Sequence, residues 1–326
     1  MSESGSQPSW TELMRRGEFA AAWRLSDVAL HERAGVPCWG WPRHLQYIWD
    51  GRSLAGRRVL VRCYHGLGDT VQFIRFLPQL KEAAAETIVW AQPALLPLLA
   101  TASGIDRLLP LHDGVPDVAF DADVELMELP HVFRTTLETI PRHVPYLHVA
   151  PSSWPQAPEN GELAVGVVWR SGDWDVSRSV PARVMARLAK VAGVKLYLLQ
   201  EASAAAEWPN DTAVRWCPSP VAQLASAIGA MDLVISVDSH PAHLAGALGV
   251  PVWTLPPVTA DWRWMETRDD TPWYPTMRLW RQERAGTWEP VIARVAAELG
   301  SIVGASGRLG ETSLPTEKRP ALQRAW

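Results

Sequence analysis

The sequence predicts an α/β protein made of two Rossmann-like domains facing a cleft. Three observations lead to this: strand-like apolar runs alternate with helical stretches, the alternation stops in the Pro-, Ser- and Asn-rich stretch 149–162, and it then starts again. Strands separated by crossover helices form parallel sheets, which bind ligands outside the carboxyl ends of their strands. The predicted parts are a helical extension (1–50), a first domain (51–150), a linker (151–162), a second domain (163–300) and a disordered tail (301–326).

The extension is expected to contain a helical hairpin. Between residues 9 and 34, apolar residues recur at helical spacing on both sides of "RRGEF", which predicts two short helices joined at Gly17. A hairpin of this size is also one unit of a tetratricopeptide-like array, but no second copy follows at a period of about 34 residues. A simple helical extension is therefore favoured over a repeat.

The first domain is predicted to open with the strand "VLVRCY", residues 59–64. A helix over 70–84 follows, and Pro78 should kink it or end it near Leu77, because proline cannot continue the helical hydrogen bonds. Further elements are expected at the strand "TIVWAQ", the helix "ALLPLLATA" and the strand "IDRLLPL".

The second domain repeats this alternation. Its predicted strands are "LAVGVVWR", "VKLYLLQ", "DLVISVD" and "VPVWTL", and its predicted helices are 181–192, "SPVAQLASAIGAM" and 241–248. The tail from Ser301 is polar and aperiodic, which is typical of a disordered segment.

Composition excludes several functional classes. The formal net charge of −4 shows no basic excess, so a nucleic-acid partner is not expected. Cys38, Cys63 and Cys217 are far apart, which indicates neither a zinc site nor a disulfide framework and fits a reducing cytosol. No signal-peptide core and no run of about 18 apolar residues occurs, so we expect a cytoplasmic protein without an integral membrane segment.

The turn "HGLGD" after the first strand is a candidate site. Backbone N–H groups at a glycine turn that opens a helix attract anions, which makes Gly66 and Gly68 candidates for ligand contact. Asp69 has two open interpretations, a helix cap or a general base facing the cleft. The turn is not G-x-G-x-x-G, and neither a Walker nor a G-x-S-x-G motif occurs, which disfavours dehydrogenases, P-loop enzymes and hydrolases.

A second candidate site follows the strand "DLVISVD". Asp238 ends this strand, and the N–H groups of Ser239 and its neighbours could hold a phosphate, although both residues could merely cap a helix. His240 and His243 have no third and fourth ligand nearby, so no metal site is expected. His243 could also be a core histidine.

Two further loops at strand ends carry candidate ligand contacts. Arg170 and Arg178 follow the strand "VGVVWR", and an arginine there can form a fork to a diphosphate. Gln200 and Glu201 follow the next strand and could contact a nucleotide base or ribose.

Three blocks then point to a family: "GLGDTVQFIRFLPQL" (66–80), "SVDSHPAHLAGALGVPVW" (236–253) and "DWRWMETRDDTPWYPTMRLWRQ" (261–282). They resemble the glycosyltransferase domain of glycosyltransferase family 9, the heptosyltransferase-like family, and most closely its branch often found behind tetratricopeptide repeats. The resemblance covers about residues 52 to 299. The last block is expected to line or close the second domain, with Trp262 and Trp264 packed in a core or stacked on a base or sugar.

The resemblance implies a GT-B fold whose second domain binds the nucleotide sugar and whose first binds the acceptor. It implies a metal-independent transfer that inverts the anomeric centre. Asp69 matches the family's general base, and Arg178 matches its phosphate-contacting basic residue. The residues expected on the nucleotide-sugar side are Gly66, Gly68, Arg178, Gln200, Asp238, Ser239, His240 and His243.

The implied donor is a nucleotide sugar, with ADP-heptose as the family's best-known example, and no cofactor is expected. The acceptor would be a glycan, as in lipopolysaccharide biosynthesis, or a protein. Contact with the inner face of the membrane would be peripheral. The alternative is a non-catalytic GT-B protein that senses nucleotide sugars or acts as a scaffold, since His240 stands where the family has a small residue. A GT-B epimerase is a third, less favoured interpretation.

Overall fold

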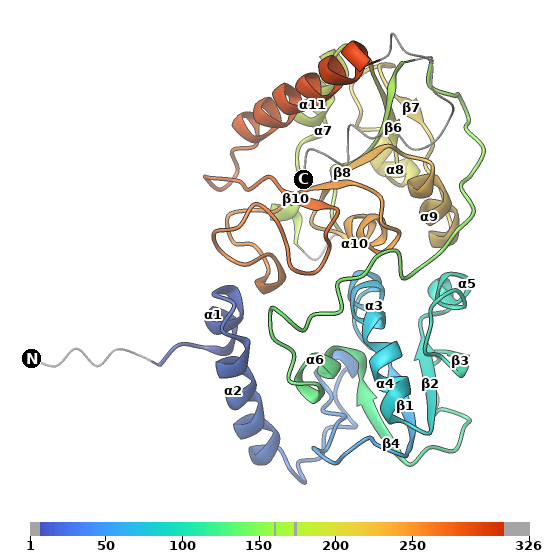
Figure 1. Cartoon of the computed structure of the whole chain (residues 1–326), viewed down its shortest axis with the longest axis vertical. Helices are drawn as coiled ribbons and strands as arrows, with labels where there is room; N and C mark the ends of the chain where they lie inside the picture. Colours follow the sequence, from blue (N-terminus) through green and yellow to red (C-terminus); the bar gives the residue numbers. More distant parts are fainter. Residues whose placement is uncertain (1–6, 160, 173–174, 310–326) are drawn as a thin grey trace, which may run out of the picture. The chain divides into compact units, whose positions relative to one another are not determined.

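A computed structural model describes residues 7–159, 161–172 and 175–309, and these form two compact units (Figure 1). Unit 1 contains the chain up to Tyr146 together with Ala260–Arg268, and unit 2 contains Leu147–Thr259 and the chain from Asp269 onward. The predicted α/β class is confirmed. The division differs from the predicted domains in that Ala260–Arg268, which the sequence places in the second domain, belongs to unit 1.

Unit 1 begins with the expected helical hairpin. Helices α1 (Trp10–Arg15) and α2 (Phe19–Glu32) are joined at Gly17, whose φ of 77° is a conformation that glycine adopts without strain. Ser9 starts α1 with a capping box, in which its side chain accepts from the Glu12 amide and its own amide donates to the Glu12 side chain. The predicted pair of helices is confirmed.

The rest of unit 1 is a parallel sheet with covering helices. Its strands, in the spatial order β3-β2-β1-β4, are β1 (Arg58–Arg62), β2 (Glu86–Ala91), β3 (Arg107–Pro110) and β4 (Ala122–Glu125). Its helices are α3 (Leu67–Phe73), α4 (Leu77–Ala83), α5 (Leu96–Leu99) and α6 (Leu129–Val132), with 3₁₀ helices η1 (Arg43–Leu45), η2 (Ile74–Phe76), η3 (Pro93–Leu95) and η4 (Leu126–Glu128). The helix predicted over 70–84 is thus divided by η2, and Pro78 lies in the first turn of α4, where a missing N–H costs nothing.

Unit 2 is built on a second parallel sheet in the order β10-β9-β8-β5-β6-β7. Its strands are β5 (Leu163–Val168), β6 (Val194–Leu198), β7 (Val214–Arg215), β8 (Leu233–Val237), β9 (Val252–Leu255) and β10 (Met277–Leu279). Its helices are α7 (Ala182–Met185), α8 (Ala202–Ala205), α9 (Val221–Gly229), α10 (His240–Ala247) and α11 (Glu289–Leu309), with 3₁₀ helices η5 (Val176–Arg178) and η6 (Ala186–Lys190).

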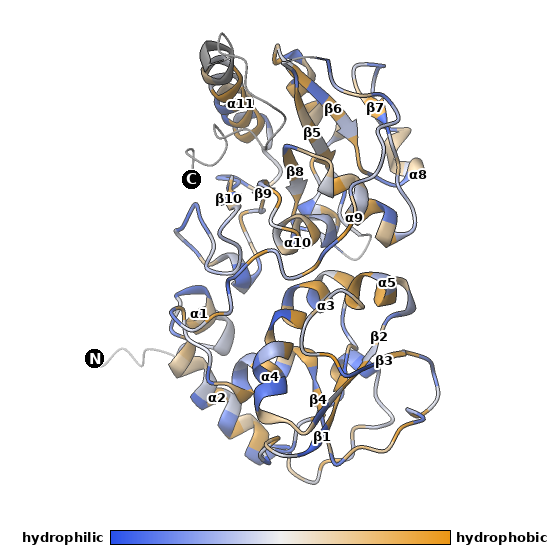
Figure 2. Ribbon diagram, turned by 45° about the vertical axis from the view of Figure 1, so that its right-hand side comes forward, coloured by the Kyte–Doolittle hydropathy of each residue, from blue (hydrophilic) through white to orange (hydrophobic). Residues whose placement is uncertain are grey.

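The central strands β5 and β8 have the composition expected of a parallel sheet that is covered on both faces. Both are buried along their whole length and appear hydrophobic in Figure 2. A strand covered by helices on both faces needs an unbroken apolar run rather than an alternating one. The run "LAVGVV" meets that requirement, and "LVISV" departs from it only at Ser236, whose buried hydroxyl donates to the carbonyl of Val237.

Two expectations about the later part of the chain are wrong. The tail does not start at Ser301, because α11 continues to Leu309, and the remainder lies outside the described residues. Val295, Leu299 and Ile302 are buried and follow one another at helical spacing on the apolar face of this helix. The average polarity of the segment from Ser301 conceals this pattern. The start of the Trp-rich block does not line unit 2 either, because Ala260–Arg268 packs in unit 1 as the loop around 3₁₀ helix η7 (Trp262–Trp264).

Candidate functional site

The site residues of unit 1 lie where the strand order changes direction. The strand β1 pairs with β2 on one side and with β4 on the other, so the connection leaving β1 and the end of β4 meet at the same sheet edge. In open parallel sheets, such a switch point is where ligands bind. Asp69, in the first turn of α3, and Glu125, the last residue of β4, both belong to this edge.

Asp69 is a helix cap and is also held by a second group. Its Oδ2 accepts from the amide of Gly66, the N-cap residue of α3, at 2.9 Å. A Cβ on Gly66 would lie 3.1 Å from that oxygen, which is a tight contact, while Gly68 lies in the first helical turn. The other oxygen, Oδ1, accepts from Arg263 Nη2 at 2.6 Å. The Asp69 side chain nevertheless stays 29% exposed.

Arg263 is a site residue that the sequence did not reveal. It belongs to η7 and is only 7% exposed. Its Nε donates to Gln72 Oε1 and its Nη1 to Asp261 Oδ1, both at 2.8 Å. The sequence feature that marks this residue is its place between Trp262 and Trp264, in the block that resembles the family.

Glu125 and His65 add two titratable groups beside Asp69. Glu125 is buried, and burial raises its pKa to about 8, although the amide of Met127 donates to its Oε2 at 2.6 Å. His65 Nε2 lies 3.8 Å from the same oxygen. Burial lowers the pKa of His65, and the Asp69 carboxylate opposes that shift. Both groups are therefore predominantly neutral near pH 7. Neither was predicted from the sequence.

Unit 2 has an equivalent switch point between β5 and β8. The strand β5 pairs with β6 on one side and β8 on the other. Arg178, which follows β5, donates from Nη1 to the carbonyl of Asp238 at 3.0 Å and lies 3.8 Å from its Oδ2. Asp238 is buried at the end of β8. The structure therefore brings these two predicted residues together, with the guanidinium next to the start of α10.

Ser239 and His240 form the beginning of α10. Ser239 occupies the N-cap position but makes no side-chain cap, since its hydroxyl donates to the carbonyl of Val237 at 3.2 Å. His240 is half-buried, and burial lowers its pKa to about 4. It is therefore a neutral imidazole at pH 7 and offers a hydrogen-bond donor rather than a cation.

His243 and Gln200 have partners that hold them in place. His243 is buried and its Nδ1 is hydrogen-bonded to the hydroxyl of Tyr274 at 2.9 Å. Gln200 Oε1 accepts from the amides of Trp169 and Arg170 at 3.1 and 3.0 Å, which ties the end of β6 to that of β5. These contacts fit a structural role as well as a ligand contact. Both assignments stay predictions.

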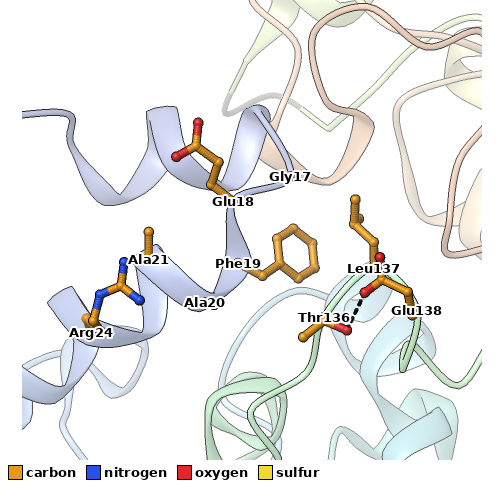
Figure 3. A pocket seen from close by; sticks show the side chains of 9 residues that line it. All are labelled: Gly17, Glu18, Phe19, Ala20, Ala21, Arg24, Thr136, Leu137 and Glu138. Atoms are coloured by element: carbon orange, nitrogen blue, oxygen red, sulfur yellow. Dashed lines mark hydrogen bonds between the residues drawn. The ribbon is translucent and has the colours of Figure 1, made fainter.

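A pocket in unit 1 lies apart from the residues of both candidate sites. It opens between the start of α2 and the loop after α6, where the Thr136 hydroxyl donates to Glu138 at 2.7 Å (Figure 3). It contains none of the predicted site residues. Within residues 7–159, 161–172 and 175–309, no group of three or more His, Cys, Asp or Glu could hold a metal ion. No helix in those ranges is long and apolar enough to span a membrane.

Comparison with known proteins supports the resemblance seen in the sequence. The family model described as glycosyltransferase family 9 (heptosyltransferase) matches residues 200–282. Residues 200–282 are therefore similar to glycosyltransferase family 9. The matched segment includes Gln200, the Asp238 turn with α10, and the Arg263 loop, so the resemblance inferred from the sequence is confirmed.

Two solved structures are similar to the chain in fold. E. coli ADP-heptose lps heptosyltransferase II is 16% identical with a TM-score of 0.52, covering 77% of this chain and 99% of that one. A family 9 glycosyl transferase from Veillonella parvula is 15% identical with a TM-score of 0.50, covering 71% and 87%. These likenesses show the fold, GT-B. Protein FlbA from Caulobacter vibrioides is 26% identical over 287 residues, and the chain spans about half (48%) of its length.

Proposed function

We propose that the chain is a metal-independent, inverting glycosyltransferase that moves a sugar from a nucleotide-sugar donor to a glycan or protein acceptor in the cytoplasm. The observation that carries the proposal is the Asp69 carboxylate at the switch point of unit 1, held in one orientation and still partly exposed. The family 9 match supports the same class of reaction.

Asp69 would act as the general base. A carboxylate has about four lone-pair positions on its two oxygens, and the bonds from Gly66 and Arg263 use two of them. The remaining positions can accept the proton of an acceptor hydroxyl, whose oxygen then attacks the anomeric carbon as the bond to the diphosphate breaks. The cap and base interpretations of Asp69 are thus compatible.

The donor would bind to unit 2 at the end of β8. Arg178 and the N-terminal amides of α10 supply positive charge and N–H donors for the leaving diphosphate. His240 would add a neutral donor rather than charge. ADP-heptose is the donor we propose to test first, because the similar solved structures include an ADP-heptose lps heptosyltransferase II.

The test is calorimetric titration in EDTA with ADP, UDP, GDP and their sugar conjugates, followed by assays of nucleotide release. Asp238→Ala should lose donor binding. Asp69→Asn should bind the donor as the wild type does but lower kcat by roughly 10² to 10⁴, the contribution of a general base. Panels of sugar glycosides and of serine-containing peptides serve as acceptors, and donor hydrolysis gives an acceptor-independent rate.

The outcomes separate the proposal from its rival. Metal-free binding with turnover that depends on Asp69 supports the transferase. Nucleotide-sugar binding without turnover, unchanged in Asp69→Asn, would favour the sensor or scaffold. Full activity of Asp69→Asn would show that another group is the base.

A further inference from the structure

Several groups besides Asp69 hold the guanidinium of Arg263 in place. Gln72 and Asp261 each accept from it at 2.8 Å. The rings of Trp262 and Phe73 lie 4.8 and 5.3 Å from its central carbon, within the range of cation–π contact. The remaining fork nitrogen is thereby aimed at Asp69 Oδ1.

This arrangement fixes the orientation of the Asp69 carboxylate. Arg263 holds one oxygen at 2.6 Å and the Gly66 amide holds the other at 2.9 Å, so rotation about the carboxylate axis would break both bonds. A fixed carboxylate presents its remaining lone pairs in a defined direction. Proton transfer depends on such alignment, since a displacement of about 1 Å can cost roughly 10²-fold in rate.

The segment that carries Arg263 is in turn braced by helix α1. The Trp10 ring packs edge-on against Trp262 with centroids 5.4 Å apart. Arg15 Nη2 donates to the carbonyl of Ala260 at 2.5 Å. The hairpin thus contacts both ends of the stretch that leads to Arg263.

We propose that Arg263 is the positioning residue for Asp69 and that α1 braces the loop that carries it. This inference rests on the proposed function, in which Asp69 is the base. It assigns the helical extension a role inside unit 1. Arg263 itself acts through Asp69 and need not contact either substrate.

The test is a double-mutant cycle with Asp69→Asn and Arg263→Gln. Arg263→Gln should lower kcat for ADP release from ADP-heptose by about 10- to 100-fold with little change in donor KM. In the Asp69→Asn background, the same substitution should cost almost nothing further. Arg263→Lys keeps the charge without the fork and should fall between wild type and Arg263→Gln. Equal fold losses in both backgrounds would overturn the positioning role.

Helix α1 offers a matched pair of variants. Arg15→Ala removes the bond to Ala260 and should lower kcat several-fold. Arg16→Ala changes the exposed residue that directly follows α1 and should leave kcat unchanged. Equal effects of the two variants would overturn the brace.

A second cycle, measured by urea unfolding, does not depend on turnover. The losses of stability in Asp69→Asn and Arg263→Gln should be less than additive in the double variant, because each single change already breaks their shared bond. Additive losses would overturn the inferred contact. If the wild type releases no ADP and transfers no sugar, the proposed function fails, and this cycle still reports on the contact.

Discussion

His240 is a residue whose charge state should report where the diphosphate binds. Burial lowers its pKa to about 4, and a nearby diphosphate would raise that pKa by stabilising the imidazolium. Binding of ADP-heptose at pH 5.5 should therefore take up a proton. Its diphosphate is esterified at both ends and does not itself titrate in this range. Titrations in buffers of different ionisation enthalpy should give different binding enthalpies.

The control for this measurement is His240→Asn, which keeps a neutral donor and cannot take up the proton. Its binding enthalpy should not vary with the buffer. If the wild type also shows no variation, the diphosphate does not bind beside His240. In that case the start of α10 would not be the phosphate site.

Glu125 predicts a pH dependence of stability. Its pKa is raised to about 8 in the folded protein from an ordinary value of 4.5, so between these values the folded state holds more protons than the unfolded state. Stability from this group is complete below about pH 4.5 and is lost as the pH rises towards 8. Relative to Glu125→Gln, which resembles the protonated form, the wild type should lose roughly 4 kcal/mol of unfolding free energy over this range.

Urea unfolding at pH 5, 6.5 and 8 measures this difference. Glu82→Gln is the matched control, because Glu82 is an exposed carboxylate on α4. Its difference from the wild type should not change with pH. If the wild type and Glu125→Gln differ by the same amount at every pH, Glu125 is ionised in the folded protein throughout.

Residues of the two sites differed in how far the sequence could reveal them. Asp69 and Asp238 each follow an apolar strand and open a helix, so a local pattern identifies them. Arg263 is 194 positions from Asp69, and no spacing rule connects the two. Glu125 is conspicuous only once β4 is known to pair with β1, which is a property of the sheet order.

At the scale of elements, most of the fold was predictable because apolar runs and turn residues act locally. Both hairpin helices and the buried strands follow from such patterns. The strands that the sequence did not predict are either very short or defined by tertiary contact. The strand β7 consists of the two residues Val214–Arg215. The strand β10 lies in the Trp-rich block and is recognisable only by its pairing with β9. The loop around η7 is the functionally important case, since its place in unit 1 depends on packing against α1 and α3.

The whole molecule therefore cannot be divided into two independent halves at its linker. The chain leaves unit 1 near Tyr146, yet Ala260–Arg268 returns to it, with Arg263 and Trp264 buried there. A protease site inserted beside exposed Pro151 should allow the backbone to be cut without separating the pieces. The cut protein should elute as one species in gel filtration under native conditions, because the larger fragment contributes buried side chains to the smaller fragment's core.

Arg263→Ala shows whether this segment holds the two pieces together. It removes bonds to Asp69 and Gln72 within unit 1, so the cut variant should dissociate at least tenfold more readily than the cut wild-type protein, a difference of about 1.4 kcal/mol. Arg16→Ala, cut in the same way, should behave like the wild type, because Arg16 is exposed. If the cut wild-type pieces separate at micromolar concentration, the loop is not a firm part of unit 1, and the positioning of Asp69 by Arg263 would lose its structural basis.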